Sequence, residues 1–196
     1  MQLFDIFSGY ISNEMNLDQE KDLIERSKNS SEAFGELYKM YCNQIFGYSL
    51  RRSADVDVAK DITSSVFFIA LKNKKKFEWQ GVPFSHWLYR IANREIINHF
   101  NTRKHETSYE VAVDENNTYL QDELAKANNE INRYDEYLVL QTYISKLSPK
   151  YQEVITLRYF EDLSIAEITQ ILQRPEGTVK SLLFRGVRQL RKMMES

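Results

Sequence analysis

Glycine and proline are scarce in this chain, with six glycines and three prolines among 196 residues. Because these two residues supply most tight turns, a fold built from many short strands is disfavoured. Long stretches rich in Leu, Ile, Ala, Glu and Lys lie between them, and such stretches favour helices. Hydrophobic residues make up 42% of the chain, which suffices for one globular domain or two small ones. We therefore predict an all-α protein.

Apolar residues recur at three- and four-residue spacings in two regions, which predicts two small helical modules. Within the first module, residues 53–57 form a polar break, and residues 73–83 form a longer break that is basic and aromatic. The stretch between the modules has little apolar periodicity and is expected to be an acidic linker. The predicted order is an N-terminal extension, a first module, a linker and a second module, at residues 1–21, 22–104, 105–129 and 130–196.

The formal net charge of −2 conceals a strong segregation of charge along the chain. Residues 72–104 hold eight Lys and Arg against two acids, and residues 174–196 hold six against two. Between these two basic segments, residues 105–136 hold nine acids and two bases. Two basic surfaces that flank an acidic connector favour a protein that binds nucleic acid at two points.

Several classes of protein are disfavoured by the sequence. Cys42 is the single cysteine, so an internal disulfide is excluded and a cysteine-based zinc site is disfavoured. No signal peptide or membrane span is recognisable, and we expect a cytoplasmic protein. The three histidines lack metal-ligand spacing, and no glycine-rich phosphate loop is recognisable. We therefore expect no enzyme activity, metal, cofactor or small-molecule substrate.

A helix, a tight turn and a second helix are predicted near the C-terminus. Ser164 is followed three residues later by Glu167, which is the spacing of a capping box at a helix start. A four-residue break at 173–176 precedes the second helix, which Pro175 can open. One face of that helix carries bases and a hydroxyl but no acid, at Gly177, Lys180, Ser181, Phe184, Arg185 and Arg188. Such a face can enter the DNA major groove, although a basic face on a terminal helix can also be simply solvated.

Residues 147–193 resemble the C-terminal promoter-binding region of bacterial RNA polymerase sigma factors, the sigma-70 superfamily. The resemblance is carried by Leu157-Arg158-Tyr159-Phe160, by Leu163-Ser164 and by Gly177-Thr178-Val179-Lys180-Ser181. The first module is similar to the family's N-terminal region at Ala33-Phe34, at Asp61 to Phe67 and at Trp87-Leu88-Tyr89-Arg90-Ile91-Ala92. Only a linker separates the two modules, which is typical of the extracytoplasmic-function (ECF) group.

The resemblance implies a protein that binds core RNA polymerase and directs it to promoter DNA, and a membrane-bound anti-sigma factor is a further partner common in the family. The helix-turn-helix is expected to bind the −35 element through Thr178, Lys180, Ser181, Phe184, Arg185 and Arg188. The first module is expected to hold the melted −10 strand through Lys75, Lys76, Phe77, Trp79, Trp87, Arg90, Asn93, Arg94 and Asn98. Contacts to core polymerase are expected from Asp57, Asp61, Ser64 and Ser65.

This chain departs from the family pattern at several of these positions. Ser64-Ser65 stands where Gln followed by an acid is usual, Asn93-Arg94 reverses the common order, and Asn98 replaces an Asp. Trp87 lies in an amphipathic run, so core packing and strand separation both stay open for it. Phe77 and Trp79 lie in a basic, glycine-containing loop, where we expect less burial in a core.

Three rival interpretations also stay open. A stand-alone helix-turn-helix repressor would explain the C-terminal helices but not the basic, aromatic loop of the first module. A helical enzyme would need a reactive group of side chains, which the sequence does not display. An interaction module without DNA binding is compatible with the departures from the family pattern.

Overall fold

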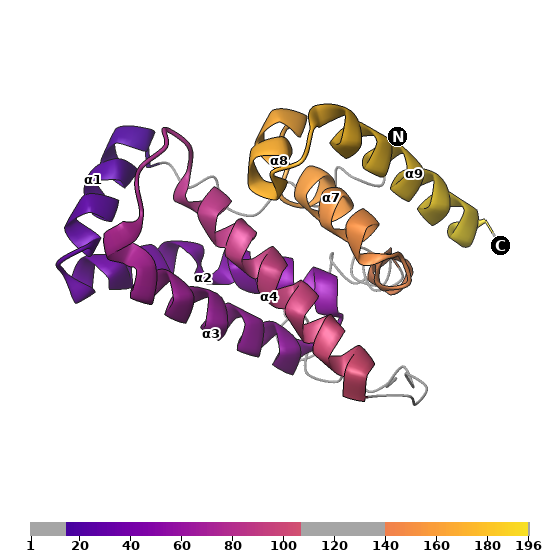
Figure 1. Ribbon diagram of the computed structural model, residues 1–196, viewed down its shortest axis with the longest axis horizontal. Coiled ribbons are helices and arrows are strands. Elements are labelled where there is room, and N and C mark those ends of the chain that lie inside the picture. Colours follow the sequence, from indigo (N-terminus) through magenta and orange to yellow (C-terminus); the bar gives the residue numbers. More distant parts are fainter. Residues whose placement is uncertain (1–14, 107–139, 196) are drawn as a thin grey trace, which may run out of the picture.

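The structure is a computed structural model that describes residues 15–106 and 140–195. In both ranges every regular element is a helix, which confirms the all-α prediction (Figure 1). The first range contains α1 (Leu17–Ser27), α2 (Ser31–Ser53), α3 (Val56–Asn73), the 3-10 helix η1 (Lys74–Lys76) and α4 (Phe84–Glu106). The second contains helical residues 140–145, then α7 (Pro149–Tyr159), α8 (Ile165–Leu172) and α9 (Glu176–Met194). None of the helices in these ranges is long and apolar enough to cross a membrane.

Polar side chains explain where the first three helices begin. Asn16 and Gln19 form a capping box at the start of α1, in which Asn16 Oδ1 accepts from the Gln19 N–H at 2.9 Å. Ser30 caps α2 and Asp55 caps α3, each by accepting a hydrogen bond from a backbone N–H in the first turn. Between α2 and α3, Ala54 takes a left-handed φ of 54°, which ends α2 within the predicted polar break.

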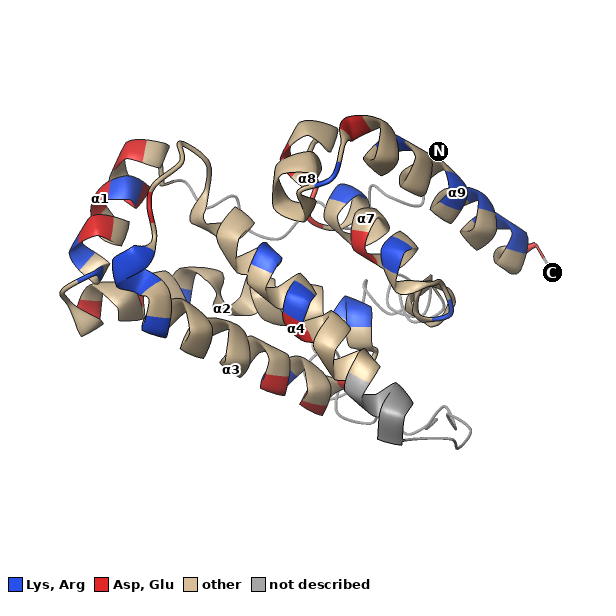
Figure 2. Cartoon of the chain, viewed as in Figure 1, with Lys and Arg blue, Asp and Glu red and all other residues tan. Residues whose placement is uncertain are grey.

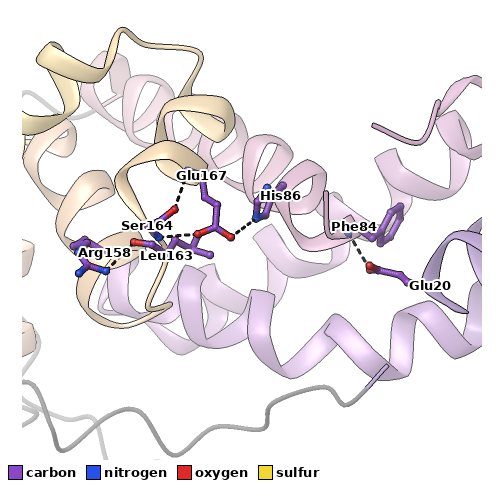
Figure 3. Close-up of polar contacts among 7 residues, drawn as sticks. All are labelled: Glu20, Phe84, His86, Arg158, Leu163, Ser164 and Glu167. Carbon is purple, nitrogen blue, oxygen red and sulfur yellow. Dashed lines mark hydrogen bonds and ion pairs between the residues drawn. The ribbon is translucent and has the colours of Figure 1, made fainter. Parts of the chain in front are cut away.

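The first module is a bundle in which α2 packs against α1, α3 and α4. Its core holds apolar side chains from all four helices, including Leu23, Leu37, Ile45, Val66, Leu88 and Ile96. Glu20 of α1 is buried as well, and its carboxylate accepts hydrogen bonds from the Tyr41 hydroxyl and, at 2.9 Å, from the Phe84 N–H (Figure 3). Helix α1 therefore ties the start of α4 to the bundle, and it begins at Leu17, inside the segment assigned to the N-terminal extension.

The second module is built on α7, which packs against α8 and α9. Helix α9 buries an apolar side that includes Val179, Leu183 and Leu190. The predicted linker at 105–129 lies outside the described residues except for its first two, which extend α4.

The two modules lie side by side, with α8 against α4 and α7 against α2 (Figure 1). One hydrophobic cluster runs through both of them, from Leu23 in α1 to Leu190 in α9. A polar contact also joins them, because Gln141 Nε2 donates to the Leu50 carbonyl of α2 at 3.0 Å. Helical periodicity does not predict this packing, since it records which face is apolar and not what covers that face.

Candidate nucleic-acid interface

Helices α8 and α9 form the predicted helix-turn-helix. Ser164 and Glu167 make both hydrogen bonds of the predicted capping box: Ser164 Oγ accepts from the Glu167 N–H at 3.3 Å, and the Ser164 N–H donates to Glu167 Oε2 at 2.8 Å (Figure 3). Arg158 of α7 donates to the Leu163 carbonyl at 3.1 Å, which fixes the loop before α8. Helix α9 begins directly after Pro175.

The predicted DNA-reading face of α9 points into solvent. Ser181 is half-buried, and the side chains that are exposed are those of Thr178, Lys180, Phe184, Arg185 and Arg188. Phe184 is 70% exposed, so an apolar ring stands among bases on this face. Lys180 Nζ also pairs with Glu176 one turn earlier, at 2.5 Å. Figure 2 shows Lys and Arg gathered along the C-terminal half of α9.

The aromatic side chains of the predicted strand-binding loop pack against the bundle. The Phe77 ring centroid lies 4.6 Å from that of Trp87 and 5.4 Å from that of Phe84. Trp79 is also half-buried against the core. Phe77 and Trp79 are therefore more buried than we expected for this loop, because α4 begins directly after it and offers it an aromatic surface. The neighbouring bases of η1 are exposed, at Lys75 and Lys76.

The predicted strand-binding residues of α4 fall on two sides of the helix. Arg94 and Asn98 are exposed. Arg90 and Asn93 instead face the second module, and Arg90 Nη2 donates to the Gln170 carbonyl of α8 at 3.2 Å. The four residues are therefore not gathered on a single free surface in this arrangement.

One side of α3 carries the residues predicted to contact core polymerase. Three of them are exposed, namely Asp57, Asp61 and Ser64, and Ser65 is half-buried. Two apolar residues that we did not predict continue the same exposed stripe: Phe68 is 66% exposed and Leu71 is 43% exposed. Their spacing of four and seven residues from Ser64 is the sequence signal that places them on this face.

Glu161 lies between the two modules and was not predicted as a functional residue. Its side chain is 4% exposed and forms an ion pair with Arg51 of α2. Its second oxygen accepts a hydrogen bond from the Tyr89 hydroxyl of α4. Burial raises the pKa of Tyr89 well above its ordinary value, and the Glu161 carboxylate raises it further.

Glu153 of α7 is a second buried acid at this boundary, with 1% of its side chain exposed. It pairs with Arg174 Nη2 at 2.8 Å and lies close to Asn93 of α4. Asn93 Oδ1 in turn accepts from Arg52 Nη1 of α2 at 2.9 Å. Burial raises the pKa of Glu153, while Arg52 and Arg174 act in the opposite direction.

His86 of α4 completes the polar contacts between the modules. Its Nε2 lies 3.5 Å from Glu167 Oε1 of the α8 capping box (Figure 3). Burial lowers the pKa of His86, against the effect of Glu167, and nearby Arg90 lowers it further. In the described ranges, no group of His, Cys, Asp and Glu is placed to hold a metal ion.

Two family models match the chain, one in each module. The model "Sigma-70 region 2" matches residues 37–106, and "Sigma-70, region 4" matches residues 137–190. Among curated proteins, the ECF RNA polymerase sigma factor SigW of Bacillus subtilis is 31% identical over 185 residues, covering 92% of this chain and 98% of SigW. The ECF RNA polymerase sigma factor BldN of Streptomyces coelicolor is 30% identical over 182 residues, covering 88% of this chain and 65% of BldN.

Solved structures share the fold at lower identity. CnrH in complex with the cytosolic domain of CnrY has a TM-score of 0.66 at 16% identity, covering 90% of this chain and 97% of that chain. The sigma factor RpoE in complex with the anti-sigma factor NepR from Bartonella quintana has a TM-score of 0.61 at 19% identity, covering 83% and 96%.

Fold and surface together define a protein of two helical modules, one of which presents a helix-turn-helix with an exposed basic helix. The chain belongs to the ECF RNA polymerase sigma factors of the sigma-70 family. Its function is promoter recognition and transcription initiation with core RNA polymerase.

Proposed function

We propose a division of labour among the surfaces of this sigma factor. Helix α9 reads the −35 duplex, the loop at 77–83 with α4 holds the melted −10 strand, and the exposed side of α3 binds core polymerase. The loop, α3 and α4 belong to the module at residues 22–104, and α9 belongs to the module at residues 130–196. The observation that carries this proposal is the exposed face of α9, where bases and an aromatic ring stand on a helix held by a capped helix-turn-helix.

Two neighbouring residues of α9 are suited to read different base pairs. Arg185 is exposed, and a guanidinium can donate two hydrogen bonds to the major-groove edge of guanine. Phe184 offers an apolar ring, which suits the methyl group of thymine. Lys180 already pairs with Glu176, so it contributes a weaker attraction to phosphate.

The energy of promoter opening explains why strand capture needs the polymerase. Melting about ten base-pair steps costs about 1.4 kcal/mol each, or roughly 14 kcal/mol. Stacking one exposed base on an aromatic ring returns only about 1–3 kcal/mol. The packed rings of Phe77, Phe84 and Trp87 support the loop, so that the half-buried Trp79 and the bases of η1 can meet a strand once polymerase has opened it.

The side of α3 that binds core polymerase combines charge with an apolar anchor. Asp57 and Asp61 lie at one end of the stripe, and Phe68 and Leu71 lie at the other. Aromatic side chains are common energetic centres of protein interfaces, and Phe68 is the most exposed residue of this kind on the first module's described surface.

Run-off transcription with purified core polymerase tests the function as a whole, and Arg185→Ala tests the reading helix. If Arg185 binds guanine, its removal should cost about 1–3 kcal/mol and relax preference at one upstream base pair. Lys150→Ala is the matched control, because Lys150 is an exposed base of α7 outside the reading face. Unchanged upstream preference and salt dependence in Arg185→Ala would remove α9 as the reading surface.

The contact with thymine is tested by changing the DNA bases and comparing the wild-type protein with Phe184→Ala. Replacing upstream thymines by uracils removes only the methyl groups from the DNA. We expect one of these replacements to weaken wild-type holoenzyme binding and to have no further effect on Phe184→Ala. Equal losses in both proteins would show that Phe184 does not read the methyl group.

A further inference from the structure

The proposed strand-binding loop at 77–83 is anchored at both of its ends. At its start, the Phe77 ring packs on two rings of α4, with its centroid 4.6 Å from that of Trp87 and 5.4 Å from that of Phe84. Directly after its end, the Phe84 N–H donates to the Glu20 carboxylate of α1 at 2.9 Å (Figure 3). The second anchor therefore comes from a different helix, more than sixty residues earlier in the chain.

The middle of the loop takes its course from these two anchors. Trp79 is half-buried, while its neighbours Glu78 and Gln80 are exposed. Gly81 follows with a positive φ of 73°, a conformation that favours glycine. In a segment this short, the place of the Trp79 ring depends on where the two ends are held. A shift of the start of α4 would therefore move the ring.

The bond from Glu20 fixes where α4 begins. Phe84 is the first residue of α4, so its N–H has no partner within the helix. A carboxylate at this place accepts from the free N–H and puts a negative charge at the positive end of the helix dipole. Glu20 is 3% exposed and Phe84 is 2% exposed, so the N–H is shielded from water. Losing the carboxylate leaves a buried donor unsatisfied, and a shift of the start of α4 towards water relieves that cost.

Glu20 is itself held in a fixed place. The Tyr41 hydroxyl of α2 donates to the same carboxylate, and Leu23 and Ile24 anchor α1 in the core of the bundle. The carboxylate thus stands on a rigid element, as the precise placement of a neighbouring group requires. The sequence had assigned Glu20 to an N-terminal extension, with no role in the binding of DNA.

We propose that Glu20 is a positioning residue for the capture of the melted −10 strand. It does not contact DNA. It acts through the Phe84 N–H, which sets the start of α4 and with it the course of the loop that carries Trp79. Helix α1 is therefore a functional part of the strand-binding site. This inference rests on the proposed role of the loop in holding the melted strand.

Strand capture is measured as the ratio of two affinities of the reconstituted holoenzyme. Both probes come from a promoter at which the wild-type holoenzyme initiates in run-off transcription. One probe is the upstream duplex, which ends before the −10 element. The other is the same duplex continued by the −10 non-template strand as a single-stranded tail. Loss of folded protein lowers both affinities by the same factor, so it cancels in the ratio.

Glu20→Ala should lower this ratio by about tenfold, the effect of losing one stacked base. Tyr41→Phe is the matched control, because it removes the other hydrogen bond to the carboxylate, leaves the Phe84 N–H with its acceptor and should keep the wild-type ratio. Glu20→Gln keeps an oxygen that can accept from this N–H, so its ratio should lie between those of wild type and Glu20→Ala. If Glu20→Ala fails to fold, Glu20→Asp takes its place, since the shorter side chain draws the carboxylate away from α4 and should also lower the ratio.

Tryptophan fluorescence of the free full chain gives a second readout, which needs no DNA. Trp79 and Trp87 are the two tryptophans of the chain, and they lie in the loop and at the start of α4. A displaced loop exposes the Trp79 ring to water. Glu20→Ala should therefore shift the emission to longer wavelength while far-UV circular dichroism stays that of a folded protein, and Tyr41→Phe should not shift it.

A wild-type ratio in Glu20→Ala would refute the inference, even with a shifted emission. A lowered ratio with wild-type emission would also refute it, because the loop would not have moved. So would equal losses in Glu20→Ala and Tyr41→Phe, which would reflect the loss of any buried hydrogen bond.

Trp79→Ala separates these results from a failure of the proposed function. If Trp79→Ala lowers the ratio and Glu20→Ala does not, the role of Glu20 alone is overturned. If Trp79→Ala keeps the wild-type ratio, the loop does not capture the strand through this ring, and both proposals are overturned.

Discussion

A methyl group at Gly186 should weaken the packing that positions the DNA-reading helix. A Cβ at this position would lie 3.0 Å from Ile155 Cδ1 and 3.2 Å from Tyr151 Cβ, both on α7. Ile155 is fully buried and the Tyr151 Cβ is attached to the backbone, so neither neighbour can give way without disturbing the packing of α7 against α9. Overpacking costs about 1–3 kcal/mol, against a gain of about 1 kcal/mol for replacing a helical glycine by alanine. We expect Gly186→Ala to lower the free energy of unfolding by up to about 2 kcal/mol.

Gly35→Ala is the matched control for this prediction. Gly35 also lies inside a helix, α2, and a Cβ there meets no atom within 4 Å. This substitution should raise the free energy of unfolding by up to about 1 kcal/mol. Urea unfolding followed by circular dichroism measures both changes. If Gly186→Ala stabilised the protein as much as Gly35→Ala does, the close approach of α7 and α9 would be refuted.

Two further predictions concern buried titratable groups of the first module. Glu20→Ala leaves the Tyr41 hydroxyl and the Phe84 N–H without their acceptor, so it should lower the free energy of unfolding by about 2 kcal/mol or more in urea titrations, and Glu20→Gln by less. Burial lowers the pKa of His86, with Glu167 and Arg90 as its charged neighbours, so the unfolded state binds a proton at a higher pH than the folded state. The free energy of unfolding should therefore fall as pH drops below about 6.5, by at most about 1.4 kcal/mol per pH unit, and His86→Gln should remove this component. Equal pH slopes for wild type and His86→Gln would contradict this account.

Local signals in the sequence predicted much of the helix-turn-helix. The capping box at Ser164 and Glu167 depends on residues three apart, and the structure forms both of its bonds. The same kind of signal stands at Asn16 and Gln19, where it marks the start of α1 inside the segment that we assigned to an extension. Caps can be predicted because the atoms that satisfy one another are neighbours along the chain.

Aromatic residues in the loop before α4 were harder to place. The bases around Phe77 suggested a solvated loop, yet its ring packs on Phe84 and Trp87. A polar backbone and a buried ring are compatible at one position, because the side chain can reach the core while the loop stays at the surface. Composition describes the segment, whereas burial depends on what the neighbouring helix presents to each side chain.

The contacts between the modules lie beyond any local pattern. Glu161 and Asp162 are adjacent acids, yet 4% of one side chain and 88% of the other are exposed. The partner of Glu161 is Arg51, 110 residues earlier. Charge summed over segments assigns this acid to the second module and this base to the first, although the two form an ion pair with each other. The charges that stay exposed at the surface therefore depend on how the two modules pack, which no count of charges along the chain can decide.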